Sequence, residues 1–148
     1  MGLADLFKKN IVIGDESLAR GFVYAWTAVA VADGQISNAE LGKLNTFAKA
    51  TDATKNFYSE TWIAAIFEEA IKIYKQQGMD ALIATIGPLF ANAQSKEKQI
   101  LLYTLMDLGC IDGDFSSHEM GAIKSIVESI DISREDVLFA GLIFAANK

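Results

Sequence analysis

Hydrophobic residues recur along most of this chain every three or four positions, which is the spacing of one face of an α-helix. The pattern predicts helices over about residues 15–32, 38–51, 59–77, 96–111, 117–130 and 133–146, a further helix from about residue 80 that residues 87–88 kink or split, and a short amphipathic piece within residues 1–13. A single proline and few β-branched runs also favour long helices. We therefore expect an all-α fold, a compact bundle of about seven to eight helices. No linker divides the chain, so residues 1–148 are expected to form a single domain.

Two of the expected helices, residues 15–32 and 96–111, are apolar nearly all round. A helix without a polar face is buried on several sides. These two helices are therefore expected to lie at the centre of the molecule and to pack against each other.

One segment of the chain occurs twice. Residues 33–41 read Asp-Gly-Gln-Ile-Ser-Asn-Ala-Glu-Leu, and residues 112–120 read Asp-Gly-Asp-Phe-Ser-Ser-His-Glu-Met. The correspondence extends outward, for example from Tyr24 to Tyr103. A spacing this long is not a solenoid period. It predicts two pseudo-symmetric helix–turn–helix halves related by a rough two-fold rotation.

Much of the repeated motif is explained by local structure. Residues 37–40 and 116–119 both read Ser-x-x-Glu, the pattern of a capping box at a helix start. Gly34 and Gly113 supply the left-handed conformation that ends a preceding helix. A helix corner used twice, with no ligand, is one interpretation that the pattern leaves open.

Asp33 and Asp112 are not explained by capping. Each follows the C-terminal end of an expected helix, where a carboxylate is unfavourable by about 0.3–1 kcal/mol unless a cation or a hydrogen-bond donor compensates it. The spacing to the following Glu matches the second half of a calcium EF-hand loop, but the first half is missing in both copies. A self-contained EF-hand is therefore rejected.

A site shared by the two copies would have enough ligands for an ion. Its carboxylates would come from Asp33, Glu40, Asp112 and Glu119, with Asp114 and His118 as possible extra ligands. A site rich in oxygen favours calcium, magnesium or manganese. No organic cofactor is expected.

Composition excludes several classes of partner and chemistry. The net charge of −6 and the pI near 4.7 exclude duplex nucleic acid as a partner and disfavour an anionic membrane. The single cysteine, Cys110, excludes an intramolecular disulfide and is expected to be a buried small hydrophobe. No signal peptide is apparent, and the longest apolar stretch, residues 22–32, is too short to span a bilayer. A cytoplasmic protein is the default expectation.

Recognised catalytic motifs are missing from the sequence. It has no Gly-x-Ser-x-Gly elbow, no phosphate-binding glycine loop and no Cys-x-x-Cys pair. His118 is expected in the first turn of an exposed helix, and Trp26 and Trp62 are expected in the core.

With its doubled Asp-Gly-x-apolar-Ser-x-x-Glu motif on paired helices, the chain resembles the TerB-like tellurite-resistance proteins over roughly residues 17–130. The resemblance implies a small helical domain of a bacterial tellurite-resistance and stress-response system that joins membrane-associated assemblies. It also implies that Asp33, Glu40, Asp112 and Glu119 hold a divalent cation. The second copy departs from the family's Ala-Asp-Gly by having Ile111, and its Asp114 and His118 have no counterpart in the first copy, so an asymmetric site is possible.

Three functions remain open at this point. The first is a non-enzymatic domain that binds a divalent cation or acts as an adaptor for a protein partner. The second is a metal-dependent hydrolytic enzyme, in which Glu119, Asp114 or His118 would serve as the base for a metal-activated water. The third is a structural interaction module that binds partners, or a second copy of itself, through the apolar run of residues 137–146.

Overall fold

The computed structural model describes residues 16–32, 59–109 and 117–146, and within these ranges all regular structure is helical. The all-α prediction is confirmed for this part of the chain. Six helices are described rather than seven to eight, and the helical segments expected within residues 1–13 and 38–51 lie outside it. The helices are α2 (Glu16–Ala30), α5 (Glu60–Gln77), α6 (Met79–Leu89), α7 (Ser95–Gly109), α8 (Ser117–Ser129) and α9 (Arg134–Ala146).

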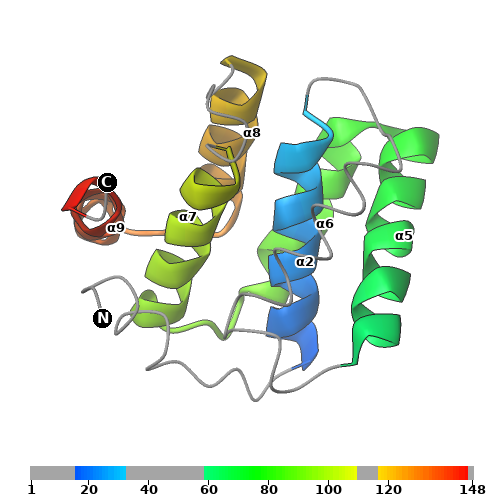
Figure 1. Cartoon of the computed structure of the whole chain (residues 1–148), viewed down its shortest axis with the longest axis horizontal. Coiled ribbons are helices and arrows are strands. Elements are labelled where there is room, and N and C mark those ends of the chain that lie inside the picture. Colours follow the sequence, from blue (N-terminus) through cyan, green and yellow to red (C-terminus); the bar gives the residue numbers. More distant parts are fainter. Residues whose placement is uncertain (1–15, 33–58, 110–116, 147–148) are drawn as a thin grey trace.

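Helix α2 is the central element, as its apolar sequence predicted. It packs against α5, α6, α7 and α8 (Figure 1). From Leu18 to Val29 all its residues are buried except Arg20. Helix α7 packs directly on α2, and its residues 100–105 are also buried. The predicted contact between the two apolar helices is therefore confirmed, although α2 and α7 each end about two residues earlier than expected.

Helix α5 begins and ends where its sequence signals predicted. Ser59 Oγ accepts a hydrogen bond from the backbone N–H of Trp62 at 3.2 Å, which caps the helix start. Gly78, with φ of 91°, ends the helix in a conformation that a side chain would strain. The buried stripe of α5 is made by Ile63, Ile66, Phe67, Ala70 and Ile71.

Residues 87–88 do not split the helix, one of the two outcomes predicted for them, since α6 continues through both to Leu89. Pro88 lies one residue before the end of α6, so its missing N–H affects only the last turn. Gly87 has a packing reason: a Cβ at this position would come within 2.8 Å of Ser129 Oγ on α8. Ser129 Oγ itself donates to the Ile83 carbonyl at 3.2 Å, so α6 and α8 approach closely at this point.

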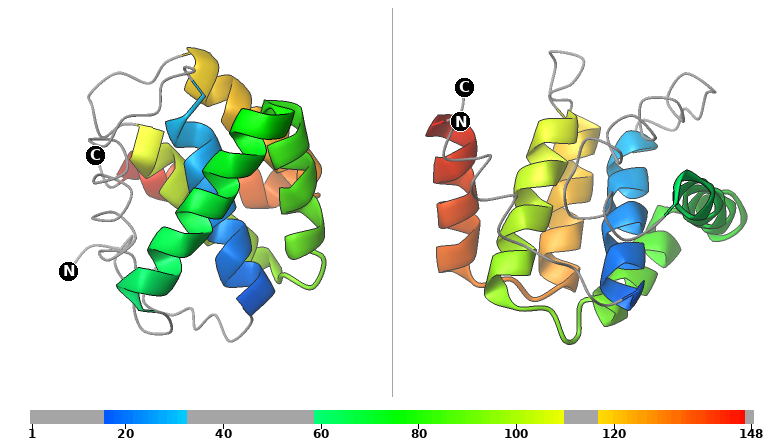
Figure 2. Two further views of the ribbon diagram at one scale, coloured as in Figure 1. Left: turned by 90° about the vertical axis from the view of Figure 1, so that its right-hand side faces the viewer. Right: turned by 60° about the horizontal axis from the view of Figure 1, so that its bottom comes forward.

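Helix α9 occupies the edge of the bundle. Its one extensive contact within the described residues is with α7, and Figure 1 and the right-hand view of Figure 2 place it at one edge of the group of helices. Ser133 caps α9 as predicted, because its Oγ accepts from the Asp136 N–H at 3.1 Å. In the part of the chain that the structure describes, no helix is both long and apolar enough to cross a membrane.

Candidate functional site: the ends of α2 and α7

The predicted metal ligands fall mostly beyond the described ranges. Asp33, Glu40, Asp112 and Asp114 lie outside them, so the convergence of the carboxylates stays a prediction. Glu119 lies in the first turn of α8 and is half-buried. His118 is exposed, as expected. Within residues 16–32, 59–109 and 117–146, no three His, Cys, Asp or Glu side chains cluster in a way that could hold a metal.

The described helices nevertheless show where the two copies of the repeated motif start, because each copy follows one of them. Helices α2 and α7 run in the same direction, so their C-terminal ends lie at the same end of the molecule (Figures 1 and 2). Helix α8 begins at that same end. Asp33 follows the last residue of α2 by three positions, and Asp112 follows the last residue of α7 by the same number.

The electrostatics of this end are set by the helices themselves. The carbonyl ends of α2 and α7 each carry a partial negative charge, and neither helix has a basic residue in its last turn. Helix α8 presents its N-terminal end here, which carries a partial positive charge, and its first turn contains Glu119. Because neither last turn supplies a basic side chain, the partial negative charges of the two neighbouring helix ends attract a cation.

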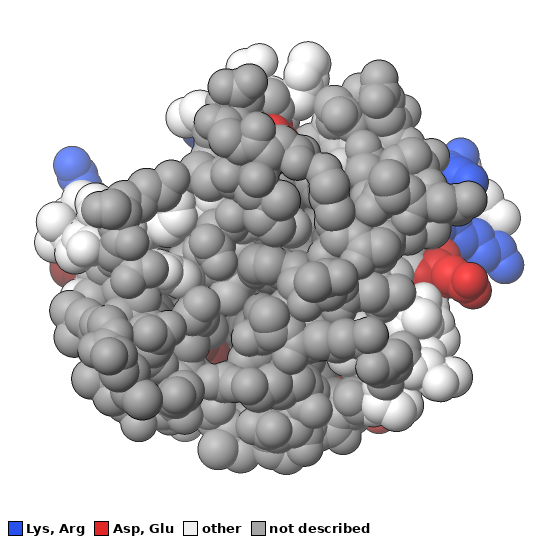
Figure 3. All heavy atoms as spheres, in the orientation of Figure 1, with Lys and Arg blue, Asp and Glu red and all other residues white. Residues whose placement is uncertain are grey.

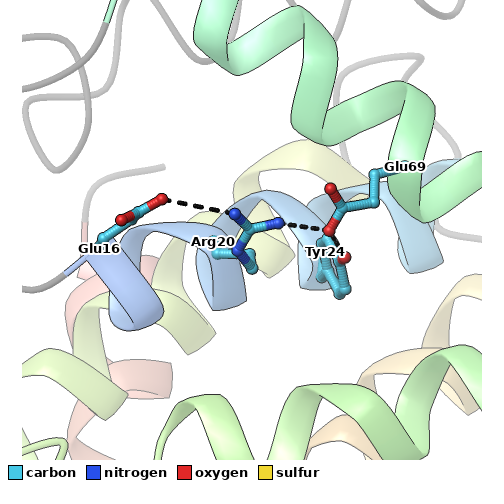
Figure 4. A network of polar contacts seen from close by, with 4 residues as sticks. All are labelled: Glu16, Arg20, Tyr24 and Glu69. Carbon is cyan, nitrogen blue, oxygen red and sulfur yellow. Dashed lines mark hydrogen bonds and ion pairs between the residues drawn. The ribbon is translucent and has the colours of Figure 1, made fainter.

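A second polar cluster was not predicted from the sequence. Figure 4 shows Arg20 and Tyr24 on α2 both directed at the carboxylate of Glu69 on α5. Arg20 also pairs with Glu16 one turn earlier on α2, at 3.4 Å. The partners are 45 and 49 residues apart, so no local pattern joins them. Only Tyr24 had a sequence signal, as a position matched in the repeat.

The pKa values of these groups reflect mutual hydrogen bonding at a partly buried joint. Burial and the hydrogen bond to Glu69 raise the pKa of Tyr24 to about 12. Burial opposes ionisation of Glu69, but the hydrogen bonds from Tyr24 and Arg20 outweigh it and lower the pKa of that carboxyl. Burial likewise opposes the charge on Arg20, while Glu69 and Tyr24 raise its pKa. The three groups satisfy one another, which indicates a joint between α2 and α5 rather than a reactive site.

A third polar cluster attaches α9 to the start of α7. Asp136, which is buried, accepts a hydrogen bond from Gln99 Nε2 at 2.6 Å. That bond, together with contacts from Ser133, Ser95 and the charge of Lys98, lowers the pKa of Asp136 against the effect of its burial. The interactions of these groups therefore join α7 and α9.

The described surface holds one notable apolar feature, on α9. Leu138 and Leu142, one helical turn apart, are 59% and 69% exposed, and the neighbouring Phe139 is 44% exposed. The prediction that the run of residues 137–146 exceeds what one core contact covers is therefore confirmed. By contrast, Figure 3 shows acidic and basic side chains side by side at its right-hand edge, on the side where Figure 1 places α5. The exposed Glu68, Glu69, Lys72 and Lys75 of α5 form no patch of one sign.

Comparison with known families agrees with the resemblance carried by the repeated motif. A family profile described as tellurite resistance protein TerB matches residues 21–141. This span includes α5 to α8 and most of α2 and α9. No curated protein and no solved structure matches the chain.

Proposed function

Because the chain belongs to the TerB family of tellurite resistance proteins, we propose that it is a non-enzymatic domain that binds a divalent cation at its two repeated acidic corners. The ligands are Asp33, Glu40, Asp112 and Glu119, and the ion is calcium, magnesium or manganese. Ion binding orders the corners and so controls docking to a protein partner in a larger, membrane-associated assembly.

The observation that carries this proposal is the common end shared by α2 and α7. Each helix is followed after the same number of residues by one copy of the Asp-Gly motif, and the two helices are parallel neighbours. The two pseudo-symmetric halves predicted from the repeat would then face each other across this end. The partial negative charges of the two helix ends add to the attraction for a cation.

Calorimetric titration with each of the three ions tests the proposal. We expect binding by the wild-type protein and a rise in melting temperature with occupancy, equivalent to about 2.7 kcal/mol at an ion concentration 100 times Kd. Asp33→Asn combined with Asp112→Asn should abolish both responses. Glu68→Gln combined with Glu128→Gln removes two exposed carboxylates elsewhere and should leave them unchanged.

The metal-free double variant adds a second criterion. Removing two carboxylates from helix C-terminal ends should leave the apo protein as stable as the wild type or more stable. A purely structural corner predicts the reverse: no response to ions, and a loss of stability when the turn hydrogen bonds weaken. No heat of binding at millimolar concentrations of all three ions would rule out the cation site.

A second candidate function is self-association through the outer face of α9. The exposed Leu138 and Leu142 favour it, because residues 137–146 contain no charged side chain. An antiparallel pair of α9 helices from two copies would place Leu138 of each against Leu142 of the other. Sedimentation over a range of concentrations tests this: wild type should dimerise and Leu142→Glu should not, while Leu142→Ala should weaken the dimer.

A further inference from the structure

A buried side-chain hydrogen bond crosses the contact between α2 and α7. The indole N–H of Trp26 donates to Thr104 Oγ1 at 2.9 Å. Trp26 is fully buried and Thr104 is 1% exposed. The Thr104 hydroxyl in turn donates to the Leu101 carbonyl of its own helix at 2.7 Å. The threonine therefore uses its hydroxyl both as an acceptor across the interface and as a donor within α7.

This hydrogen bond joins nearly equivalent positions of the two repeats. Helices α2 and α7 have bounds offset by 79 residues at both ends, which is also the offset between Asp33 and Asp112. By that offset Trp26 corresponds to Leu105, the residue after Thr104. The hydrogen bond therefore joins positions that differ by one residue in the alignment of the two repeats. The two helices also have their C-terminal ends at the same end of the molecule (Figure 1).

The hydrogen bond adds a directional contact to the packing of α2 against α7. Close-packed apolar side chains resist sliding of one helix along another, and a buried indole N–H further requires its acceptor at one position. The Trp26 ring is also held by aromatic contacts: it meets Phe22 in a T-shaped arrangement at 5.9 Å between centroids, and Phe22 stacks on Phe90 at 5.7 Å. A shift of α7 along α2 would break the hydrogen bond rather than carry the ring with it.

We propose that Trp26 and Thr104 are a positioning pair that keeps the two acidic corners level, so that ligands from both copies reach one ion. This inference rests on the proposed cation site. The pair lies inside the bundle and acts through the register of α2 and α7.

Calcium titration of variants at Thr104 tests the pair. Thr104→Val keeps the shape but removes the acceptor, and we expect it to weaken calcium binding about tenfold, within the usual range of coupling between sites. Thr104→Ser restores the hydroxyl and should return the affinity to within about twofold of wild type. The matched control is Ile66→Val, a core change on α5 that destabilises the fold without touching the α2–α7 contact.

The outcomes separate the two proposals. Wild-type affinity in Thr104→Val, or an equal loss of affinity in Ile66→Val, overturns the positioning role and leaves the cation site intact. A wild-type protein that binds none of the three ions overturns both proposals. A loss confined to Thr104→Val and restored by serine supports the positioning role.

Nuclear magnetic resonance gives a readout that a merely stabilising role would not move. Coupling is reciprocal, so a bound ion should strengthen the register that the pair maintains. Saturating calcium should therefore slow exchange of the Trp26 indole proton with solvent, relative to the indole of Trp62, which lies on α5. Equal changes at the two indoles, or none at Trp26, would contradict the proposal.

Discussion

Helix α2 is joined to its neighbours in two different ways. Towards α5 it presents Arg20 and Tyr24, which bind a Glu69 carboxylate whose side chain is 46% exposed. Towards α7 it presents Trp26, whose hydrogen bond to Thr104 is enclosed on all sides. One joint contains charges and is open to water, and the other is neutral and dry.

The difference decides how much each joint contributes to stability. Water can replace a partner of Glu69 when a hydrogen bond there is lost, and salt screens its charge. No water replaces a partner of Trp26, so a lost hydrogen bond leaves a buried donor unsatisfied. The more strongly charged joint is therefore expected to be the weaker one.

The largest effect is expected from Trp26→Ala. Truncating this fully buried ring removes apolar contacts to Phe22 and leaves a large cavity, so the free energy of unfolding should fall by about 3–5 kcal/mol. Urea denaturation followed by circular dichroism measures the loss. A loss below 1 kcal/mol would show that the interface between α2 and α7 is not the dry core described above.

Thr104→Val should cost less but still more than any change at the α5 joint. It removes the Thr104 acceptor of the buried Trp26 N–H, a penalty of about 1–3 kcal/mol. The double change Trp26→Phe with Thr104→Val removes both partners and should recover part of this loss. If the double variant lost more unfolding free energy than the two single variants together, the pairing would be contradicted.

Tyr24→Phe tests the α5 joint through its hydrogen bond. The loss of the bond to Glu69 should cost about 0.5–1.5 kcal/mol near neutral pH. Because the pKa of Tyr24 is raised in the folded state to about 12, from about 10 unfolded, its contribution is complete below pH 10 and lost as the pH rises towards 12. The wild type should therefore lose more stability than Tyr24→Phe between pH 10 and 12. Parallel curves would mean that Tyr24 titrates alike in both states.

The smallest effect is expected from Glu69→Gln. The variant loses the ion pair with Arg20 but keeps an acceptor for Tyr24, so the cost should be about 0.2–1 kcal/mol. Since salt screens exposed charges, the difference between wild type and variant should shrink further at 1 M salt. Thermal melts at low and high salt measure both effects. A cost comparable with that of Thr104→Val would reverse the order proposed for the two joints.

The two joints also show what the sequence could and could not reveal. The central place of α2 and α7 follows from their apolar sequences, and the helix starts at Ser59 and Ser133 follow from local capping chemistry. The contact of Arg20 with Glu69 depends on how α5 crosses α2, and no local pattern contains that angle. The split considered at Pro88 does not occur for a similar reason, because the position of Pro88 in the last turn of α6 depends on where the helix ends. Of the predicted metal ligands, only Glu119 and the possible extra His118 lie in described residues, and His118 is exposed as expected.

The position of α9 has a consequence for the order in which the protein opens. A helix that packs mainly on one neighbour can detach without breaking the contacts among α2, α5, α6 and α8. Proteins open in such cooperative units, with free energies below that of global unfolding. Amide hydrogens of α9 should therefore exchange before those of α2, through an opening that leaves the rest of the bundle folded. The Tyr103 ring, which Phe144 covers edge-on at 5.7 Å, would meet solvent in that partly open form.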